Sequence, residues 1–357
     1  MKSNEILCFQ SARIGVITAA NSDPAYWGQY YVDMFYRYQV AQAVWIPIME
    51  EDTDSAFLQE NVDLVRNMTG IFFGGGEPAR LAASLMIEVD GVRSDTPVME
   101  AVRDLLESGG MLGGTSAGIM ALTDTVIVTG GNSYEALVYG AHEDVTPGSS
   151  NLTFDPLGGV RVISDVLMDA HFSQSARQGR LVRLASDTGV TRAIGVDEDT
   201  ALACDQDLVC TVLGSAGVWY MDMSTAEVSN TTDTGHWSCE NVTTGYITKD
   251  DILNMANWMV TFADYKENVI NQSDGAAEVS KDIFSKESQE FNKIVKSLLV
   301  SSDKMTTGVT RENDPTRYQV SVIKTVTTVA VAASSDSSPV SYDNLVLDFY
   351  GVDDETA

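Results

Sequence analysis

Apolar and polar positions follow two different patterns along the first 122 residues of the chain, one typical of buried strands and one of amphipathic helices. Short runs of apolar and β-branched residues predict buried strands at residues 12–20, 43–48, 71–76 and 111–114. Longer segments with apolar residues at helical spacing predict helices at residues 26–40, 56–68 and 96–108. Strands and helices that alternate at this length predict a doubly wound, mostly parallel α/β sheet, whose ligands bind at the carboxyl ends of the strands.

The pattern is less regular after this region. Residues 123–159 show no clear period and are expected to form loops, whereas residues 166–172 and 193–202 predict further strands. Ser173 is a natural N-cap for a helix over 174–186, and a helix over 249–259 is expected to close the main domain. Two short antiparallel strands are expected at 209–213 and 218–220.

The composition changes near residue 264. We expect a main domain over residues 1–264, and a polar linker or mobile segment over 265–316, which is rich in Ser, Asp and Lys and low in aromatic residues. A β-rich C-terminal extension is expected over 317–357, with strands at 318–332 and 345–350.

The charge of the chain is strongly negative. Its 357 residues carry 22 basic and 51 acidic side chains, for a net charge of −29. Such a field argues against nucleic acid and anionic membranes as partners, and it would attract cationic substrates or simply favour solubility. No run of 18 apolar residues predicts a membrane span.

Cysteine and histidine usage bears on metals and on cellular location. Four cysteines without a C-x-x-C spacing and three histidines do not predict a zinc site, and no cofactor is expected. Cys204 and Cys210 flank a polar turn and could pair across a hairpin, or all thiols could be free. Five N-glycosylation sequons favour secretion, but the opening residues lack the apolar core of a signal peptide. The location is therefore left open between secreted, with a signal absent from this sequence, and cytoplasmic.

The turn after residue 114 carries the first chemical signal. Gly114-x-Ser116-x-Gly118 has the spacing of a nucleophile elbow, a strained strand-to-helix turn that exposes a serine. A Cβ at either glycine is expected to clash with the neighbouring strand or helix. A helix that begins at Ala117 would point its N–H groups toward a developing oxyanion. The alternative is a glycine-rich turn whose serine only caps the helix.

A second glycine-rich turn follows the strand at residues 71–76. The N–H groups of Gly75 and Gly76 are expected to face Ser116 and complete an oxyanion hole, and Pro78 is expected to open a helix. A phosphate loop is not predicted, because neither G-K-[ST] nor G-x-G-x-x-G is present. The alternative is a plain tight turn.

A histidine and three acids complete the candidate chemistry. His171 lies at the carboxyl end of a predicted strand, just before a predicted helix, and Asp197, Glu198 and Asp199 are the acids assigned to the end of the next strand. A serine needs a neutral imidazole as base and a carboxylate to orient that imidazole. The order Ser, His, acid excludes the α/β-hydrolase arrangement, in which His236 would be the base.

These stretches together resemble the cyanophycinases and related aspartyl dipeptidases, a group of serine peptidases. The matching motifs are Phe72-Phe-Gly-Gly-Gly-Glu77, Gly113-Gly-Thr-Ser-Ala-Gly118, Asp169-Ala-His-Phe-Ser-Gln174 and Ile194-Gly-Val-Asp-Glu-Asp-Thr200. The resemblance covers roughly residues 10–262. It implies a flavodoxin-like sandwich similar to class I glutamine amidotransferase domains, so that residues 1–264 form a catalytic domain. It also implies Ser116 as nucleophile, His171 as base and Glu198 as the third member.

The substrate pocket departs from the family pattern. Cyanophycinases cut a polymer of aspartate that carries arginine, and release β-Asp-Arg dipeptides. Pro78 stands where the family has a glutamine, Ala170 also replaces a glutamine, and Ser175 replaces the first of three arginines. Arg177 and Arg180 remain and would pair with substrate carboxylates or serve structural roles. Asp169 would bind a cationic group or brace its loop.

The resemblance implies a serine exopeptidase that acts on β-linked, cyanophycin-like or other aspartyl peptides through an acyl-enzyme. A catalytically silent binding protein on the same fold, and an esterase or amidase with the same triad, are the alternatives. The expected partner is a peptide substrate, with no nucleic acid and no membrane. The oligomeric state stays open, a homodimer included.

Overall fold

The computed structural model describes residues 11–146, 149–230, 235–333 and 339–352, which form two compact units. Of the described residues, the first unit contains 11–129, 143–146 and 153–170. The second unit contains 130–142, 149–152 and the described residues from 171 onward.

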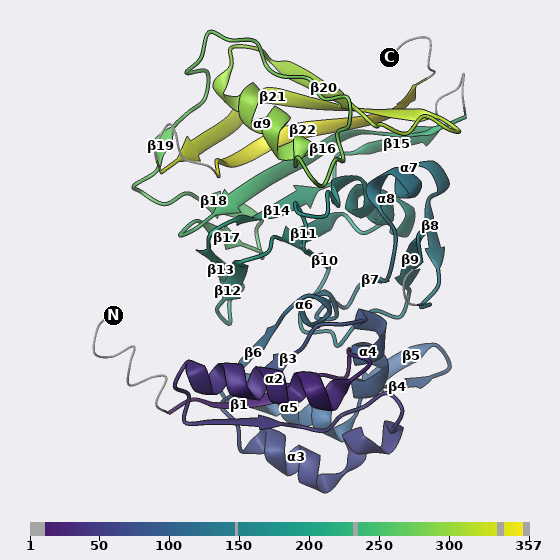
Figure 1. Cartoon of the computed structure of the whole chain (residues 1–357), viewed down its shortest axis with the longest axis vertical. Helices are drawn as coiled ribbons and strands as arrows, with labels where there is room; N and C mark the ends of the chain where they lie inside the picture. Colours follow the sequence, from purple (N-terminus) through teal and green to yellow (C-terminus); the bar gives the residue numbers. More distant parts are fainter. Residues whose placement is uncertain (1–10, 147–148, 231–234, 334–338, 353–357) are drawn as a thin grey trace. The chain divides into compact units, whose positions relative to one another are not determined.

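A parallel sheet forms the centre of the first unit (Figure 1). Its four described strands lie in the order β2-β1-β3-β6, and every pairing is parallel. The strands are β1 (Arg13–Ile17), β2 (Gln42–Trp45), β3 (Gly70–Phe73) and β6 (Met111–Gly114). The predicted parallel α/β sheet is confirmed, since each apolar run forms a strand and each amphipathic segment forms the crossover to the next.

The crossover helices begin and end where the sequence chemistry requires. They are α2 (Pro24–Arg37), the 3₁₀ turn η1 (Thr53–Phe57) with α3 (Gln59–Arg66), α4 (Pro78–Leu85) and α5 (Pro97–Glu107). Proline opens α2, α4 and α5, and the side chains of Asp23 and Thr96 cap α2 and α5 by accepting backbone N–H bonds. The expected helix opened by Pro78 is therefore present.

Helices cover both faces of this sheet. Val16 of β1 packs in a cluster with Val32 of α2, and a Cβ built on the adjacent Gly15 would meet Met68, which follows α3. Because successive strand residues point to opposite faces, α2 and the end of α3 lie on opposite sides.

The rest of the first unit is built from short elements. They are the hairpin β4 (Met86–Val89) and β5 (Val92–Asp95), then α6 (Ala117–Met120), β7 (Ile127–Val128), β9 (Leu152–Asp155) and β10 (Leu167–Ala170). β7 pairs with β9, and the buried Arg93 of β5 binds the buried Asp155 of β9 at 2.7 Å. The expectation of loops over 123–159 is wrong in part, because this stretch also contains α7 (Ser133–Tyr139) and β8 (Ala141–Glu143).

Antiparallel sheets dominate the second unit. The larger sheet contains β11, β14, β16, β22, β21 and β19 in that order, with β15 on β16 and β20 on β21. Its strands are β11 (Arg192–Val196), β14 (Gly217–Asp222), β15 (Glu227–Asn230), β16 (Trp237–Thr248), β19 (Glu267–Asn268), β20 (Met305–Val309), β21 (Arg317–Ala332) and β22 (Ser341–Val352). A smaller sheet has the order β12 (Thr200–Cys204), β13 (Val209–Gly214), β17 (Ile252–Asn254) and β18 (Met259–Thr261).

Two expectations about this unit are wrong. The strands predicted at 209–213 and 218–220 exist as β13 and β14, but they belong to different sheets and do not pair with each other. The helix predicted over 249–259 is the hairpin β17–β18, because the side chain of Asn254 accepts the N–H groups of Ala256 and Asn257 and turns the chain.

The helix after His171 also starts later than expected. α8 covers Gln178–Thr188, and Ser173 does not cap it, since Ala176 has a positive φ of 49° that interrupts helical geometry. The N–H of Ser173 donates instead to the carboxylate of Asp197.

The C-terminal part is folded onto the second unit. β22 pairs with both β21 and β16, and α9 (Glu290–Val300) buries Phe291, Ile294 and Leu298 against β20 and β21 (Figure 1). The prediction of a linker over 265–316 is therefore wrong for the residues that form α9 and β20. The boundary between the two units also does not fall at residue 264. The predicted strands of the extension are confirmed. The loop predicted between them lies mostly outside the described residues.

A buried ion pair between Lys266 and Asp251 lies beside the start of β22. Lys266 and Asp251 are both buried, and the Lys266 Nζ lies 2.7 Å from Asp251 Oδ1. Ser341, at the start of β22, donates to the second oxygen of Asp251 at 2.6 Å. Charge and hydrogen bonding thus fix the extension to the rest of the unit.

A disulfide links Cys204 and Cys210 across the β12–β13 hairpin, which is the pairing that the sequence offered as one alternative. Cys239 is free and buried, and burial raises the pKa of its thiol to about 12. None of the helices in the described part of the chain has the length and apolar character needed to cross a membrane.

Candidate active site

Ser116 occupies a strained position between β6 and α6. Its φ of 52° and ψ of −120° lie in a region that non-glycine residues rarely adopt. α6 begins at Ala117, as expected. Strain of this kind costs on the order of 1–3 kcal/mol and persists only where the surrounding structure enforces it.

Close packing leaves no room for a side chain at the two glycines on either side of Ser116. A Cβ on Gly114 would lie 2.7 Å from the backbone of Gly118, and a Cβ on Gly118 would lie 2.3 Å from the carbonyl oxygen of Phe73 in β3. The first clash is with the helix and the second with the neighbouring strand. The expectation that both positions require glycine is confirmed.

The glycine turn after β3 lies beside Ser116. A Cβ on Gly75 would lie 3.3 Å from Ser116 Cβ and 3.8 Å from its Oγ, so Gly75 faces the serine side chain. Gly76 has a φ of 141°, and its backbone passes so close to Ala20 that a Cβ would lie 2.1 Å from the Ala20 carbonyl oxygen. Burial raises the pKa of Tyr31, and a hydrogen bond from the Gly75 backbone lowers it by less.

An imidazole and a carboxylate meet in the second unit. His171 Nδ1 lies 2.9 Å from Glu198 Oε1. Of the three consecutive acids, Glu198 is the one in contact with the histidine. A carboxylate on Nδ1 favours the tautomer that carries its proton there, in which Nε2 is the unprotonated nitrogen.

Aromatic packing fixes the backbone beside His171. Phe172 is fully buried, stacks on Trp219 with ring centroids 5.0 Å apart, and donates its N–H to the Val196 carbonyl. A Cβ on Gly195 would lie 2.2 Å from the Phe172 ring, so only glycine leaves room for that ring. His171 itself has a positive φ of 48°, a strain that this packing maintains.

Asp197 ties the histidine loop to the glutamate loop. Its buried carboxylate accepts the Ser173 N–H through one oxygen and the Tyr246 hydroxyl through the other, both at 2.8 Å. Burial raises the pKa of Asp197, and these hydrogen bonds lower it by less. The Oε1 of Gln174 accepts the Glu198 N–H at 3.1 Å and forms a second link between the loops.

Sequence reasoning missed these supporting roles. Asp197 was only one of three acids after a strand, and Tyr246 lies 49 residues further along the chain. The available signal was the position of Asp197 directly after the buried strand β11, where an unpaired carboxylate is unfavourable.

The predicted substrate residues differ in their surroundings. Arg180 is buried, and its guanidinium donates to the carbonyl of Gly131 at 3.0 Å, which is the structural alternative that the sequence left open. Asp169 is fully buried, and its Oδ1 accepts the N–H of Ala170. The N–H of Ser175 donates to the His171 carbonyl. Arg177 is the N-cap residue of α8, and its N–H donates to the Phe172 carbonyl. Pro78 occupies the first turn of α4.

The candidate residues therefore fall into two groups. Ser116, Gly75, Gly76 and Ala117 belong to the first unit, and the His171–Glu198 pair belongs to the second. The first group offers a nucleophile beside backbone amides, and the second offers a proton acceptor with an oriented imidazole. Within the described residues, no group of three or more His, Cys, Asp or Glu side chains could hold a metal ion.

Comparison with known proteins places the chain among relatives of peptidases. Within that class its sequence relatives are cyanophycinases, as the motifs indicated. The cyanophycinase of Trichormus variabilis is 30% identical over 213 residues, which cover 59% of this chain and 63% of that protein. The cyanophycinase of Synechococcus elongatus is 32% identical over 220 residues, which cover 61% of each protein.

These matches are partial. The chain spans about three fifths of the length of these curated relatives. A crystal structure of a peptidase from an acI-B1 Actinobacterium matches 58% of this chain and 75% of its own, with 24% identity and a TM-score of 0.42. No protein-family model matches the chain.

Proposed function

We propose that this protein is a serine peptidase of the cyanophycinase kind, which hydrolyses aspartyl peptides through an acyl-enzyme on Ser116. The observation that carries the proposal is the 2.9 Å contact between His171 Nδ1 and Glu198 Oε1, in a chain whose strained Ser116 matches the same family. His171 is the general base in this proposal, and Glu198 orients it.

The chemistry follows from these groups. Ser116 Oγ attacks the carbonyl carbon of the scissile amide while His171 Nε2 takes the serine proton, and Glu198 stabilises the imidazolium. The imidazolium then protonates the leaving amine, and the C–N bond breaks to give an ester on Ser116. Water, deprotonated by His171, hydrolyses that ester and restores the serine.

Backbone amides would stabilise the oxyanion formed in each half-reaction. Gly75, Gly76 and Ala117 are the proposed donors. The amide of Ala117 opens α6 and needs no rearrangement for this role. Gly75 lies against the serine, since a Cβ on it would be 3.8 Å from Ser116 Oγ.

The arrangement of the first unit also supports a more specific fold proposal. We infer a flavodoxin-like sheet with a nucleophile elbow, as in class I glutamine amidotransferase domains. The strand order β2-β1-β3-β6, the helices on both faces and the sharp turn after β6 support this inference.

The substrate is proposed as a peptide with an aspartyl linkage. Cyanophycin itself is one candidate, and dipeptides with an α- or β-linked aspartyl residue are others. Pro78, Ala170 and Ser175 replace family pocket residues, and the buried Arg180 is held by a backbone carbonyl. Asp169, Arg177 and Arg180 are retained from the family pattern, and we propose that the altered positions shift the preference away from the polymer.

The test compares the natural chain with Ser116→Ala, and with Ser224→Ala as a control at an exposed turn serine. Each is incubated with cyanophycin, with a panel of aspartyl dipeptides and with a fluorophosphonate label, and products are identified by mass spectrometry. We expect hydrolysis and labelling in the natural chain and in the control, and neither in Ser116→Ala.

Other outcomes would favour the other hypotheses. Failure of the natural chain both to react with the label and to cut any peptide would indicate a silent binding protein. Labelling with hydrolysis of simple esters but of no peptide would indicate an esterase. Peptide hydrolysis that survives in Ser116→Ala would refute the role of Ser116.

A further inference from the structure

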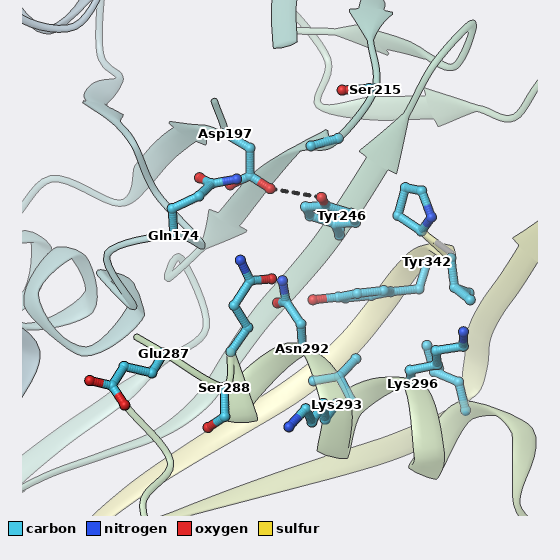
Figure 2. A pocket seen from close by; sticks show the side chains of 16 residues that line it. Gln174, Asp197, Ser215, Tyr246, Glu287, Ser288, Asn292, Lys293, Lys296 and Tyr342 are labelled. Atoms are coloured by element: carbon cyan, nitrogen blue, oxygen red, sulfur yellow. Dashed lines mark hydrogen bonds between the residues drawn. The ribbon is translucent and has the colours of Figure 1, made fainter. Parts of the chain in front are cut away.

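A cavity of about 400 Å³ lies entirely within the second unit. Most of its lining comes from the chain after residue 264, chiefly from α9, from residues 287–289 just before it and from Pro339, Val340 and Tyr342. The rest of the lining comes from Gln174, Asp197, Ser215, Ala216 and Tyr246 (Figure 2). Its size is in the range of pockets that hold small organic ligands. The part of the chain after residue 264 therefore contributes a pocket wall as well as strands.

One wall of the cavity is cationic. Lys293 and Lys296 stand one helical turn apart on α9, and Asn292 adds an amide beside them. Lys293 is paired with Glu290 at 3.0 Å, and the described residues offer Lys296 no carboxylate within ion-pair distance. Glu287 also lines the cavity, but the two ammonium groups on α9 outnumber this carboxylate and favour an anionic ligand.

The opposite wall carries a carboxylate and phenols. In Figure 2 Asn292 points from α9 toward Tyr246, and the Tyr342 hydroxyl points toward Asn292. The rings of Tyr246 and Tyr342 stack with centroids 6.1 Å apart. Tyr246 donates to Asp197, whose carboxylate retains lone pairs for a further donor. A cationic group would be favoured at this wall.

We propose that this cavity binds a small zwitterion with an additional carboxylate, that is, an acidic amino acid or a short acidic peptide. Its carboxylates lie toward Lys293 and Lys296, and its ammonium group lies toward Asp197. Phosphate is disfavoured, because it would meet the same lysines without a partner for the carboxylate wall. The proposal does not depend on the proposed peptidase activity.

Ligand binding in this cavity would also affect the position of the His171–Glu198 pair. Gln174 lines the cavity and accepts the N–H of Glu198 through its side-chain oxygen. A ligand that contacts Gln174 therefore restrains the backbone that carries the Glu198 carboxylate.

Isothermal titration calorimetry of the full chain tests the proposal, with L-aspartate, succinate and inorganic phosphate as separate probes. We expect L-aspartate to bind with one-site stoichiometry. Succinate, which lacks the amino group, and phosphate should bind at least about tenfold more weakly. The variant Lys293→Gln with Lys296→Gln should weaken aspartate binding by about tenfold or more.

The matched control is Lys281→Gln with Lys304→Gln, which removes the same charge from exposed positions outside the cavity. It should bind aspartate like the natural chain. Asn292→Asp is a second variant, which places a negative charge in the cavity and should also weaken binding.

Three outcomes would overturn the proposal. They are no aspartate binding at millimolar concentration, aspartate binding that both cavity variants leave unchanged, and phosphate binding as tight as that of aspartate. The first two exclude the site, and the last makes it a general anion site.

Discussion

Asp197 is the side chain whose replacement tests the site most directly, because it holds the loops of His171 and Glu198 together. Its carboxylate accepts one hydrogen bond from the Ser173 backbone and one from the Tyr246 hydroxyl. We compare Asp197→Ala, which removes both acceptors, with Asp197→Asn, which keeps the shape. In the Asn variant the carbonyl can accept the Ser173 N–H, and the amide can donate to the Tyr246 oxygen.

The magnitude follows from the burial of these groups. Each donor left unpaired in the interior costs about 1–3 kcal/mol, so the loss of both acceptors costs about 2–6 kcal/mol. Relief of the buried carboxylate offsets part of this cost. We therefore expect Asp197→Ala to lower the free energy of unfolding by about 2–4 kcal/mol, and Asp197→Asn by about 1 kcal/mol or less.

The pH dependence of stability gives a second test, which applies to both variants because both lack the titrating carboxyl group. Burial raises the pKa of Asp197 in the folded state, so the folded protein binds its proton more tightly than the unfolded chain does. The stability that this group contributes is full below the unfolded pKa of about 4 and is lost as pH rises through the folded pKa. The difference in free energy of unfolding between the natural chain and either variant should therefore shrink as pH rises through that window.

Urea denaturation followed by tryptophan fluorescence measures the stabilities, and hydrolysis of an aspartyl dipeptide measures kcat/KM. We expect kcat/KM to fall in Asp197→Ala, because the imidazole and the carboxylate lose their common support. Asp199→Asn, at the exposed neighbouring acid, is the control and should stay within about 0.5 kcal/mol. An Ala variant as stable and as active as the natural chain would refute the reasoning.

Three further predictions concern the ion pair, the packing and the proposed triad. Lys266→Met should lower the free energy of unfolding by about 3–5 kcal/mol, because it leaves the fully buried Asp251 without its cation; urea denaturation measures the loss. Gly195→Ala should destabilise by about 1–3 kcal/mol and lower kcat/KM, since its Cβ displaces the Phe172 ring; the same two assays apply. Glu198→Gln should lower kcat/KM by about 100-fold or more with little change in stability, as steady-state kinetics will show.

Each of these predictions has a matched control. Lys281→Met replaces an exposed lysine and should leave the stability within about 0.5 kcal/mol. Gly113→Ala adds a methyl group that meets only ordinary contact, 3.9 Å from Phe72. Glu227→Gln neutralises a glutamate of β15, away from the His171 loop. A control that behaves like its test variant would contradict the corresponding argument.

The parallel sheet of the first unit could be predicted because its signals are local. Prolines open α2, α4 and α5, side chains of Asp23 and Thr96 cap two of them, and glycines end β3 and β6. Each boundary is specified within a few residues of the chain. The glycine clashes around Ser116 belong to the same kind of signal.

The packing of the chain after residue 264 could not be predicted in the same way, because its contacts are distant in sequence. Val242 of β16 pairs with Leu347 of β22, and Lys266 is stabilised by Asp251 and Ser341. The polar composition over 265–316 hid α9, whose apolar face is complete only against β20 and β21. Tertiary burial outweighed local propensity there.

The residues of the candidate site differ in the same way, because some are predicted by local motifs and others depend on contacts distant in sequence. The motif spacing predicts Ser116, His171 and Glu198 as site residues, because each lies at the end of a predicted strand. The roles of Asp197 and Tyr246 depended on which of three consecutive acids turns inward, and spacing alone does not decide that. Only the pairing of β14 with β16, which carries Tyr246, brings the phenol to Asp197.

The extension and the His171–Glu198 pair share a structural dependence through β16. On one side β16 pairs with β14 and holds Tyr246 against Asp197; on its other side it pairs with β22 along most of its length. Without β22 the second edge of β16 would present unpaired N–H and C=O groups, and the Lys266–Asp251 pair would lose the Ser341 hydroxyl. Strand β16 therefore connects β22 to the loops that carry His171 and Glu198. We infer that the second unit requires its C-terminal strands to hold these two side chains in contact.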